Sequence, residues 1–182
     1  TEQFGDSLER MTAVTDRHSA YFALHFLNHQ VCLAHLLREL QYLSELDTNQ
    51  KWSEQIANLF REAIHERNTS PTAIINKTLW LDKLDSLLKL NVSNLGKNFN
   101  TLKNELIKCH DYIFNFLEDP MIPSDNNASE RGIRKLKIKL KNSCTFRSDF
   151  GADAFLELHS VVETAKKHNQ TPFNAIQALF EV

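Results

Sequence analysis

Residues 30–43, QVCLAHLLRELQYL, decide the fold class of this chain, because the spacing of the apolar residues changes within them. Gln30 to Leu33 is a short stretch with β propensity. From Leu33 onward, leucine recurs every three or four residues, at positions 33, 36, 37, 40 and 43, which is typical of one buried helical face. The stretch therefore predicts a short strand that gives way to a helix.

The same periodicity predicts three further helices, whose apolar residues lie within 52–63, 74–88 and 99–117. The first of these should end before Pro71 and the last at Pro120, because proline disfavours helix in the residue before it. Four such helices can bury their apolar faces against one another as a bundle. The low content of chain breakers, 4 Gly and 4 Pro in 182 residues, agrees with a mainly helical protein.

Outside this bundle, residues 12–15 predict another short strand, which ends directly before Asp16. After Pro123 we expect one helix opened by Asp-Asn-Asn, one that contains the apolar residues of 155–165, and a short one that starts at 171–172. Residues 135–141 alternate strictly, which is typical of a strand, whereas the preceding cap signal favours helix. We predict helix there as far as about Lys139.

Positive charge is concentrated in one part of a chain whose net charge is -2. Residues 131–147 contain no acid and seven cations: Arg131, Arg134, Lys135, Lys137, Lys139, Lys141 and Arg147. Such a run indicates a local site for a polyanion. The lysines at 137, 139 and 141 are also compatible with the solvated side of an amphipathic element.

Two acids are candidates for chemistry, and each has a structural alternative. Glu130 lies directly before the cations, where a carboxylate can help to hold a divalent metal over a phosphate, but Asn127–Glu130 also has the form of a capping box. Asp16 follows the predicted strand 12–15, a usual place for an active-site acid in an open α/β sheet. It can equally cap a helix through Ser19 to Phe22.

A third candidate is a zinc site formed by His25, His29, Cys32 and His35. Successive side chains alternate faces in a strand, so four convergent ligands are not expected here. We expect Cys32 to be a small buried group, and the two upstream histidines to be surface residues of a helix. Three cysteines, an odd number, do not form a complete disulfide framework, and no segment has the composition of a signal peptide or membrane span. These features predict a soluble protein of a reducing cytosol.

Four stretches in order resemble the signatures of the bacterial insertion-sequence-66 family of DDE transposases. They are Thr15–Tyr21 (TDRHSAY), Cys32–Arg38 (CLAHLLR), Asp125–Arg134 (DNNASERGIR), and Phe146–Ser148 (FRS) with Gly151-Ala152. The resemblance covers most of the chain outside the helical middle.

This resemblance implies a ribonuclease H-like core in which three acids hold two Mg²⁺ (or Mn²⁺) ions for DNA strand cleavage and strand transfer. Asp16 resembles the second acid and Glu130 the third, so both are the predicted catalytic and metal-binding residues. The seven cations are the predicted DNA-binding residues, and the partners are transposon-end and target DNA in a bacterial cytoplasm. The positions that match a family motif without an assigned role are Cys32, His35, Arg38, Asn126 and Asn127.

The family's first acid lies on an earlier strand, and only fifteen residues precede Asp16 here. Asp6 does not replace it, since its neighbours predict the end of a helix or a loop. We therefore expect the C-terminal part of the catalytic region of a transposase, inactive alone and without bound metal.

The predicted architecture is mainly α: a helical insertion at 40–118 within a truncated ribonuclease H-like α/β core, 1–39 and 119–182, with at most two short strands. Its open sheet edge would permit a homodimer. The alternative function is a non-catalytic helical module that binds nucleic acid or protein.

Overall fold

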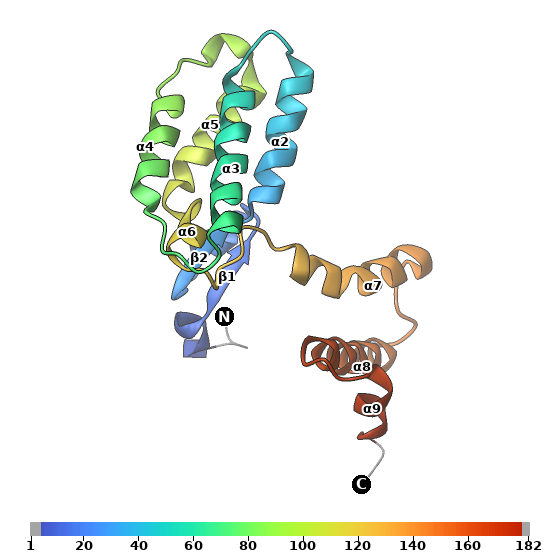
Figure 1. Cartoon of the computed structure of the whole chain (residues 1–182). Helices are drawn as coiled ribbons and strands as arrows, with labels where there is room; N and C mark the ends of the chain where they lie inside the picture. Colours follow the sequence, from blue (N-terminus) through green and yellow to red (C-terminus); the bar gives the residue numbers. More distant parts are fainter. Residues whose placement is uncertain (1–4, 180–182) are drawn as a thin grey trace. The chain divides into compact units, whose positions relative to one another are not determined.

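The computed structural model describes residues 5–179, which belong to two compact units, Thr1–Asn126 and Asn127–Val182 (Figure 1). Each unit is described by itself. The elements of the first are η1 (Gly5–Arg10), β1 (Thr12–Thr15), α1 (Ser19–Phe22), β2 (Asn28–Val31), α2 (Leu33–Leu46), α3 (Trp52–Thr69), α4 (Lys77–Leu88), η2 (Ser93–Leu95), α5 (Lys97–Lys108), η3 (His110–Tyr112) and α6 (Asn115–Glu118). Those of the second are α7 (Asn127–Ser143), α8 (Asp149–Lys167) and α9 (Pro172–Gln177).

The described part of the chain has two strands, which pair in parallel with Thr12 opposite Asn28 and Thr15 opposite Val31. The predicted strand 12–15 is confirmed. The other strand lies two residues earlier than the predicted 30–33, because Cys32 is the extended residue before α2 and Leu33 is already helical. The fully buried Leu33 belongs to the leucine face of that helix.

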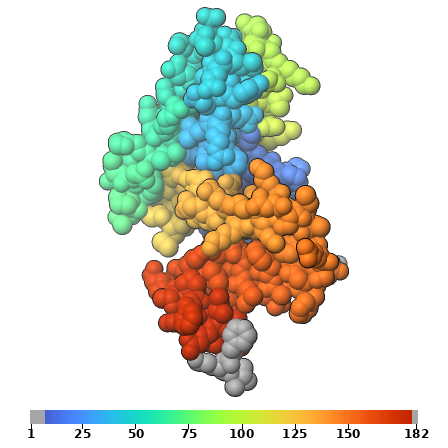
Figure 2. Space-filling model, turned by 90° about the vertical axis from the view of Figure 1, so that its right-hand side faces the viewer, coloured from blue at the N-terminus to red at the C-terminus, as the bar shows by residue number. Residues whose placement is uncertain are grey.

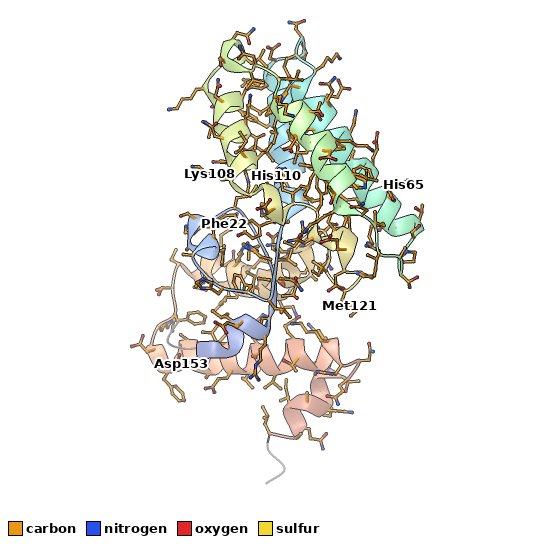
Figure 3. All side chains as sticks on the ribbon, turned by 90° about the vertical axis from the view of Figure 1, so that its left-hand side faces the viewer. Phe22, His65, Lys108, His110, Met121 and Asp153 are labelled. Atoms are coloured by element: carbon orange, nitrogen blue, oxygen red, sulfur yellow. The ribbon has the colours of Figure 1, made fainter. Side chains whose placement is uncertain are left out.

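The helices α2, α3, α4 and α5 lie side by side, with the strand pair at one end of them (Figures 1 and 3). Their apolar faces form one core cluster that also includes Val31 of β2, so strand and bundle share their buried surface. The predicted helices with apolar residues in 33–43 and 52–63 are confirmed. The one predicted within 74–88 is confirmed only from Lys77 onward, because Asn76 caps α4, so Ile74 and Ile75 lie before it. Helix α3 ends at Thr69, one residue before Ser70 and two before Pro71, as the proline predicts.

The fourth predicted helix, 99–117, is interrupted, which the apolar spacing did not indicate. The chain leaves α5 at Lys108 and continues as the short η3 and α6. The buried side chain of Gln30 explains the break: its Nε2 donates to the carbonyl of Ile113 at 2.7 Å, and its Oε1 accepts the N–H of Phe116 at 3.0 Å. Backbone groups that a continuous helix would pair internally are thus bonded to the strand.

The second unit is helical throughout the ambiguous stretch 135–141, and α7 continues to Ser143, beyond the predicted end near Lys139. Ser148 caps α8 by accepting the N–H of Gly151, and Thr171 caps α9 by accepting the N–H of Asn174, directly before Pro172. His159 of α8 bonds to the carbonyl of Gly132 in α7 at 2.8 Å. Because a carbonyl only accepts, His159 donates from Nε2.

The protein is thus mainly helical, as predicted, and its described strands number two. The ribonuclease H-like core and the division into 1–39 with 119–182 and 40–118 stay predictions. Segment 5–10, which includes Asp6, is a 3-10 helix, in agreement with the expected helix end or loop. Within residues 5–179, every helix is too short or too polar to cross a bilayer.

The bonds of Gln30 generate a prediction about stability. Gln30→Ala should lower the free energy of unfolding by about 2–4 kcal/mol, because it leaves buried backbone groups unpaired and opens a cavity. The matched control is Gln41→Ala, since the exposed side chain of Gln41 bonds to Glu45 one turn away. Its effect should stay below about 0.5 kcal/mol. Urea unfolding followed by circular dichroism measures both. Equal effects of the two substitutions would contradict the role of Gln30.

Candidate functional site

Asp16 is exposed and follows the last residue of β1. Its Oδ1 accepts the backbone N–H of His18 at 3.0 Å, which shapes the turn after the strand. The residue that caps α1 is His18, whose Nδ1 accepts the N–H of Ala20 at 3.3 Å. The alternative that Asp16 itself caps this helix is therefore wrong. Its carboxylate lies at the carboxyl end of a parallel strand, where open sheets commonly bind ligands.

A buried histidine fixes the residue before this acid. The hydroxyl of Thr15 donates to the carbonyl of Asp16 at 2.8 Å and lies 2.7 Å from Nε2 of His29. Because a hydroxyl has one proton, His29 must donate from Nε2 to the oxygen of Thr15. The imidazole therefore supports the turn that presents Asp16.

Aromatic rings pack against the imidazole of His29. Its ring centroid lies 5.2 Å from that of Phe22, which is labelled in Figure 3, and 4.9 Å from that of Tyr112. Burial lowers the pKa of His29 from its ordinary value of 6.5. The prediction that His29 is a surface residue of a helix is wrong, since it is a buried residue of β2, and His25 lies in the exposed connection after α1.

Arg17 ties the turn after β1 to the helical bundle. Its guanidinium forms ion pairs with Glu39 of α2 and with Glu105 of α5, and its side chain is 16% exposed. A planar guanidinium suits two carboxylates at once, which fixes its direction. The turn that carries Asp16 is thereby held to two helices that are distant in sequence.

The proposed zinc ligands do not converge. The Sγ of the fully buried Cys32 accepts the N–H of Asn126 at 3.4 Å, which confirms the expected buried cysteine but gives its sulfur a polar contact. His35 lies on α2, one turn before the exposed Arg38. No group of three or more His, Cys, Asp or Glu residues suited to hold a metal ion occurs in the described ranges.

The other two thiols differ in environment. Burial raises the pKa of Cys109, at the end of α5, to about 11. Cys144 is exposed in the connection after α7, with a positive φ of 59°.

A cavity of about 400 Å³ lies beside the start of β2, away from Asp16. Lys77 forms an ion pair with Glu118 at 2.8 Å and donates to Oδ1 of Asn115 at 2.8 Å. Asn115 in turn donates to the carbonyl of His29 at 2.7 Å. Sequence reasoning missed this polar group, because its members come from three elements and share no motif.

Glu130 lies in the first turn of α7, where a negative charge interacts favourably with the helix dipole. It belongs to the second unit and Asp16 to the first. Glu130, Arg134, Lys137 and Lys141 follow at intervals of four, three and four residues, so they share one side of the helix. The side chains of α7 form a continuous surface of the second unit (orange in Figure 2).

All the predicted DNA-binding cations are exposed: Arg131, Arg134, Lys135, Lys137, Lys139, Lys141 and Arg147. In α8, the hydrogen bond from Lys166 holds the pKa of Glu163 below its ordinary value, and the charges of Lys166, His159 and Lys135 act in the same direction. Phe146, the neighbour of Arg147, packs its ring against Phe155, with 5.5 Å between the ring centroids. It contributes to packing between α8 and the connection that precedes it.

Comparison with known proteins identifies one family. The sequence model described as "Transposase IS66 family" matches residues 2–154, which include Asp16, Glu130 and Arg147. The match confirms the resemblance inferred from the four motifs. Neither the curated proteins nor the solved structures gave a match.

The environment of His29 predicts a pH dependence of stability. Its folded-state pKa lies below 6.5, so on acidification the unfolded chain binds a proton first. Stability should therefore fall as the pH drops through 6.5 and continue to fall until the lowered pKa is reached. When the pH is lowered from about 7.5 to about 5.5, the melting temperature of the unchanged chain should decrease. The decrease should be smaller in His29→Gln. His168→Gln, at an exposed position, should keep the full decrease; parallel curves for His29→Gln would refute the assignment.

Proposed function

Because this chain belongs to the IS66 family of transposases, we propose that it takes part in Mg²⁺-dependent cleavage and joining of DNA strands, with Asp16 and Glu130 as two of the metal-binding carboxylates. The observation that carries the proposal is the exposed carboxylate of Asp16 directly after a parallel strand. Carboxylate oxygens are the ligands that Mg²⁺ and Mn²⁺ prefer. The donor set therefore fits the metal.

The residues around Asp16 have a defined task in this proposal. His29 and Thr15 hold the backbone at Asp16, and Arg17 ties the same turn to α2 and α5. A carboxylate on a fixed turn loses little freedom when it binds a cation, which favours a defined geometry. When bound, divalent ions lower the pKa of the attacking water and stabilise the charge that develops on the phosphate.

The proposed architecture is a ribonuclease H-like core, residues 1–39 and 119–182, that contains β1 and β2, with a helical insertion at 40–118. Two carboxylates alone bind Mg²⁺ weakly, because the ion keeps its waters when ligands are few. These 182 residues should therefore leave DNA uncut unless another acid completes the metal site. The parallel pairing of β1 with β2 supports this arrangement, since active-site acids of open sheets follow such strands.

DNA is the proposed partner of α7. Its cations are exposed, and none of the described side chains of this helix is buried. Arg131 and Arg134 suit phosphate because a guanidinium donates two parallel hydrogen bonds to its oxygens. These contacts would hold the DNA backbone near the acids without selecting a base sequence.

The catalytic assignment predicts the effect of removing each carboxylate charge. In the transposase expressed from its complete reading frame, Asp16→Asn and Glu130→Gln should each lower Mg²⁺-dependent strand cleavage by at least about 10³-fold, because a neutral amide holds the metal poorly. Asp82→Asn, at an exposed site of α4, is the control and should retain activity. Cleavage of labelled transposon-end DNA on denaturing gels measures the rates. Full activity of both variants would favour a module that only binds nucleic acid or protein.

The role of α7 predicts the salt dependence of DNA binding. Replacing Arg131 and Arg134 by Gln should weaken binding to unrelated sequences alike, and lower the slope of log affinity against log salt by about 0.9 for each lost phosphate contact. The matched control replaces Lys51 and Lys89 by Gln, which removes the same charge from exposed positions of the first unit. Fluorescence anisotropy at several salt concentrations gives both slopes. If both double variants changed the slope equally, the effect would be one of net charge, and the proposed role of α7 would be wrong.

A further inference from the structure

Cys32 contacts two parts of the chain that flank the proposed acids. Its backbone N–H donates to the carbonyl of Thr15 at 2.7 Å, one residue before Asp16. Its Sγ accepts the N–H of Asn126 at 3.4 Å, four residues before Glu130. Thr15 and Asn126 are far apart in sequence and meet at this one buried residue.

A second hydrogen bond supports the contact. The N–H of the buried Leu33 donates to the carbonyl of Ser124 at 2.9 Å. Together these bonds hold the segment 124–126 against the first residues of α2. The chain thus leaves the first unit from a fixed point, directly before α7 begins at Asn127.

The thiol is available for this contact because it does not cap its own helix. Cys32 is the residue before α2, and its side chain forms no capping hydrogen bond. At this position Ser, Thr, Asp or Asn usually accepts an N–H of the first turn. Cysteine is a weak acceptor that also fits a buried apolar site, so its sulfur can serve the N–H of Asn126 instead.

We propose that Cys32 is a positioning residue of the transposase, which fixes the segment 124–126, directly before the Glu130 helix, to the backbone that carries Asp16. The proposal rests on the proposed function of these two acids. It assigns a role to Cys32 and to the backbone of Asn126, two motif positions that had none. Cys32 is fully buried, so the proposal gives it no direct contact with metal or DNA.

The contact is tested first without any activity, by hydrogen exchange of the amides of the 182-residue chain measured by NMR. Cys32→Ala should speed the exchange of the Asn126 amide at least tenfold relative to the Ile75 amide, which donates to Leu117 and reports general stability. Cys32→Ser, which keeps an acceptor, should restore part of the protection. Cys109→Ala, at an equally buried cysteine, should leave the ratio unchanged. An unchanged ratio in Cys32→Ala would overturn the proposal.

A second pair of substitutions avoids the buried site and tests positioning in the transposase expressed from its complete reading frame. Asn126→Pro removes the N–H that the sulfur accepts, whereas Asn126→Ala removes the side chain and keeps the N–H. Relative to Asn126→Ala, Asn126→Pro should raise the Mg²⁺ concentration needed for half-maximal cleavage several-fold, with DNA affinity unchanged. Equal Mg²⁺ dependence of the two variants would refute the positioning role. The proposed function fails separately, when Asp16→Asn and Glu130→Gln retain cleavage.

Discussion

The carboxamide of Gln30 is the interaction on which the first unit depends. It joins the second strand to a segment 83 residues later, by donating to Ile113 and accepting from Phe116 within a fully buried environment. A buried amide is costly unless its hydrogen bonds are satisfied. Gln30 therefore fixes where the chain, after helices α2 to α5, comes back to the strand pair. The strand and the bundle are consequently one packed body, with Val31 and Phe116 in the same core cluster.

This arrangement connects packing to the proposed chemistry. The same strand that carries Gln30 also carries His29, whose ring supports Thr15 beside the exposed Asp16. Arg17 extends the support outward to α2 and α5. An acid that must be exposed to act is therefore held by groups that are buried or half-buried, which is how a defined geometry is kept at a surface.

The helical parts of the fold were predictable because their signal is repetitive. Leucines at regular spacing identified α2, and other apolar residues at the same spacing identified the helices that follow it. Pro71 marked the end of α3. The break after Lys108 was not predictable, since it depends on one polar side chain from a distant strand. The alternation of 135–141 was ambiguous for a physical reason: in a solvated amphipathic helix, lysines flank the apolar residues on both sides, and short windows can mimic a strand.

The sequence indicated which residues belong to the candidate site but not which contacts they make. Motif order named Asp16, Glu130 and Cys32, but the hydrogen bond of His29 and the ion pairs of Arg17 follow from tertiary contacts that no local pattern encodes. The zinc alternative failed for the same reason, because His29 and Cys32 use their polar atoms on Thr15 and Asn126. Residue spacing in the sequence does not indicate which hydrogen-bond partner a buried side chain has in the folded protein.

The unequal exposure of the thiols has a practical consequence. Cys32 and Cys109 are sequestered in the core, whereas Cys144 faces solvent immediately after the cationic helix. A maleimide dye or nitroxide spin label would consequently attach at a single native position, without mutagenesis. From there it would test spectroscopically the proposed binding of DNA to α7.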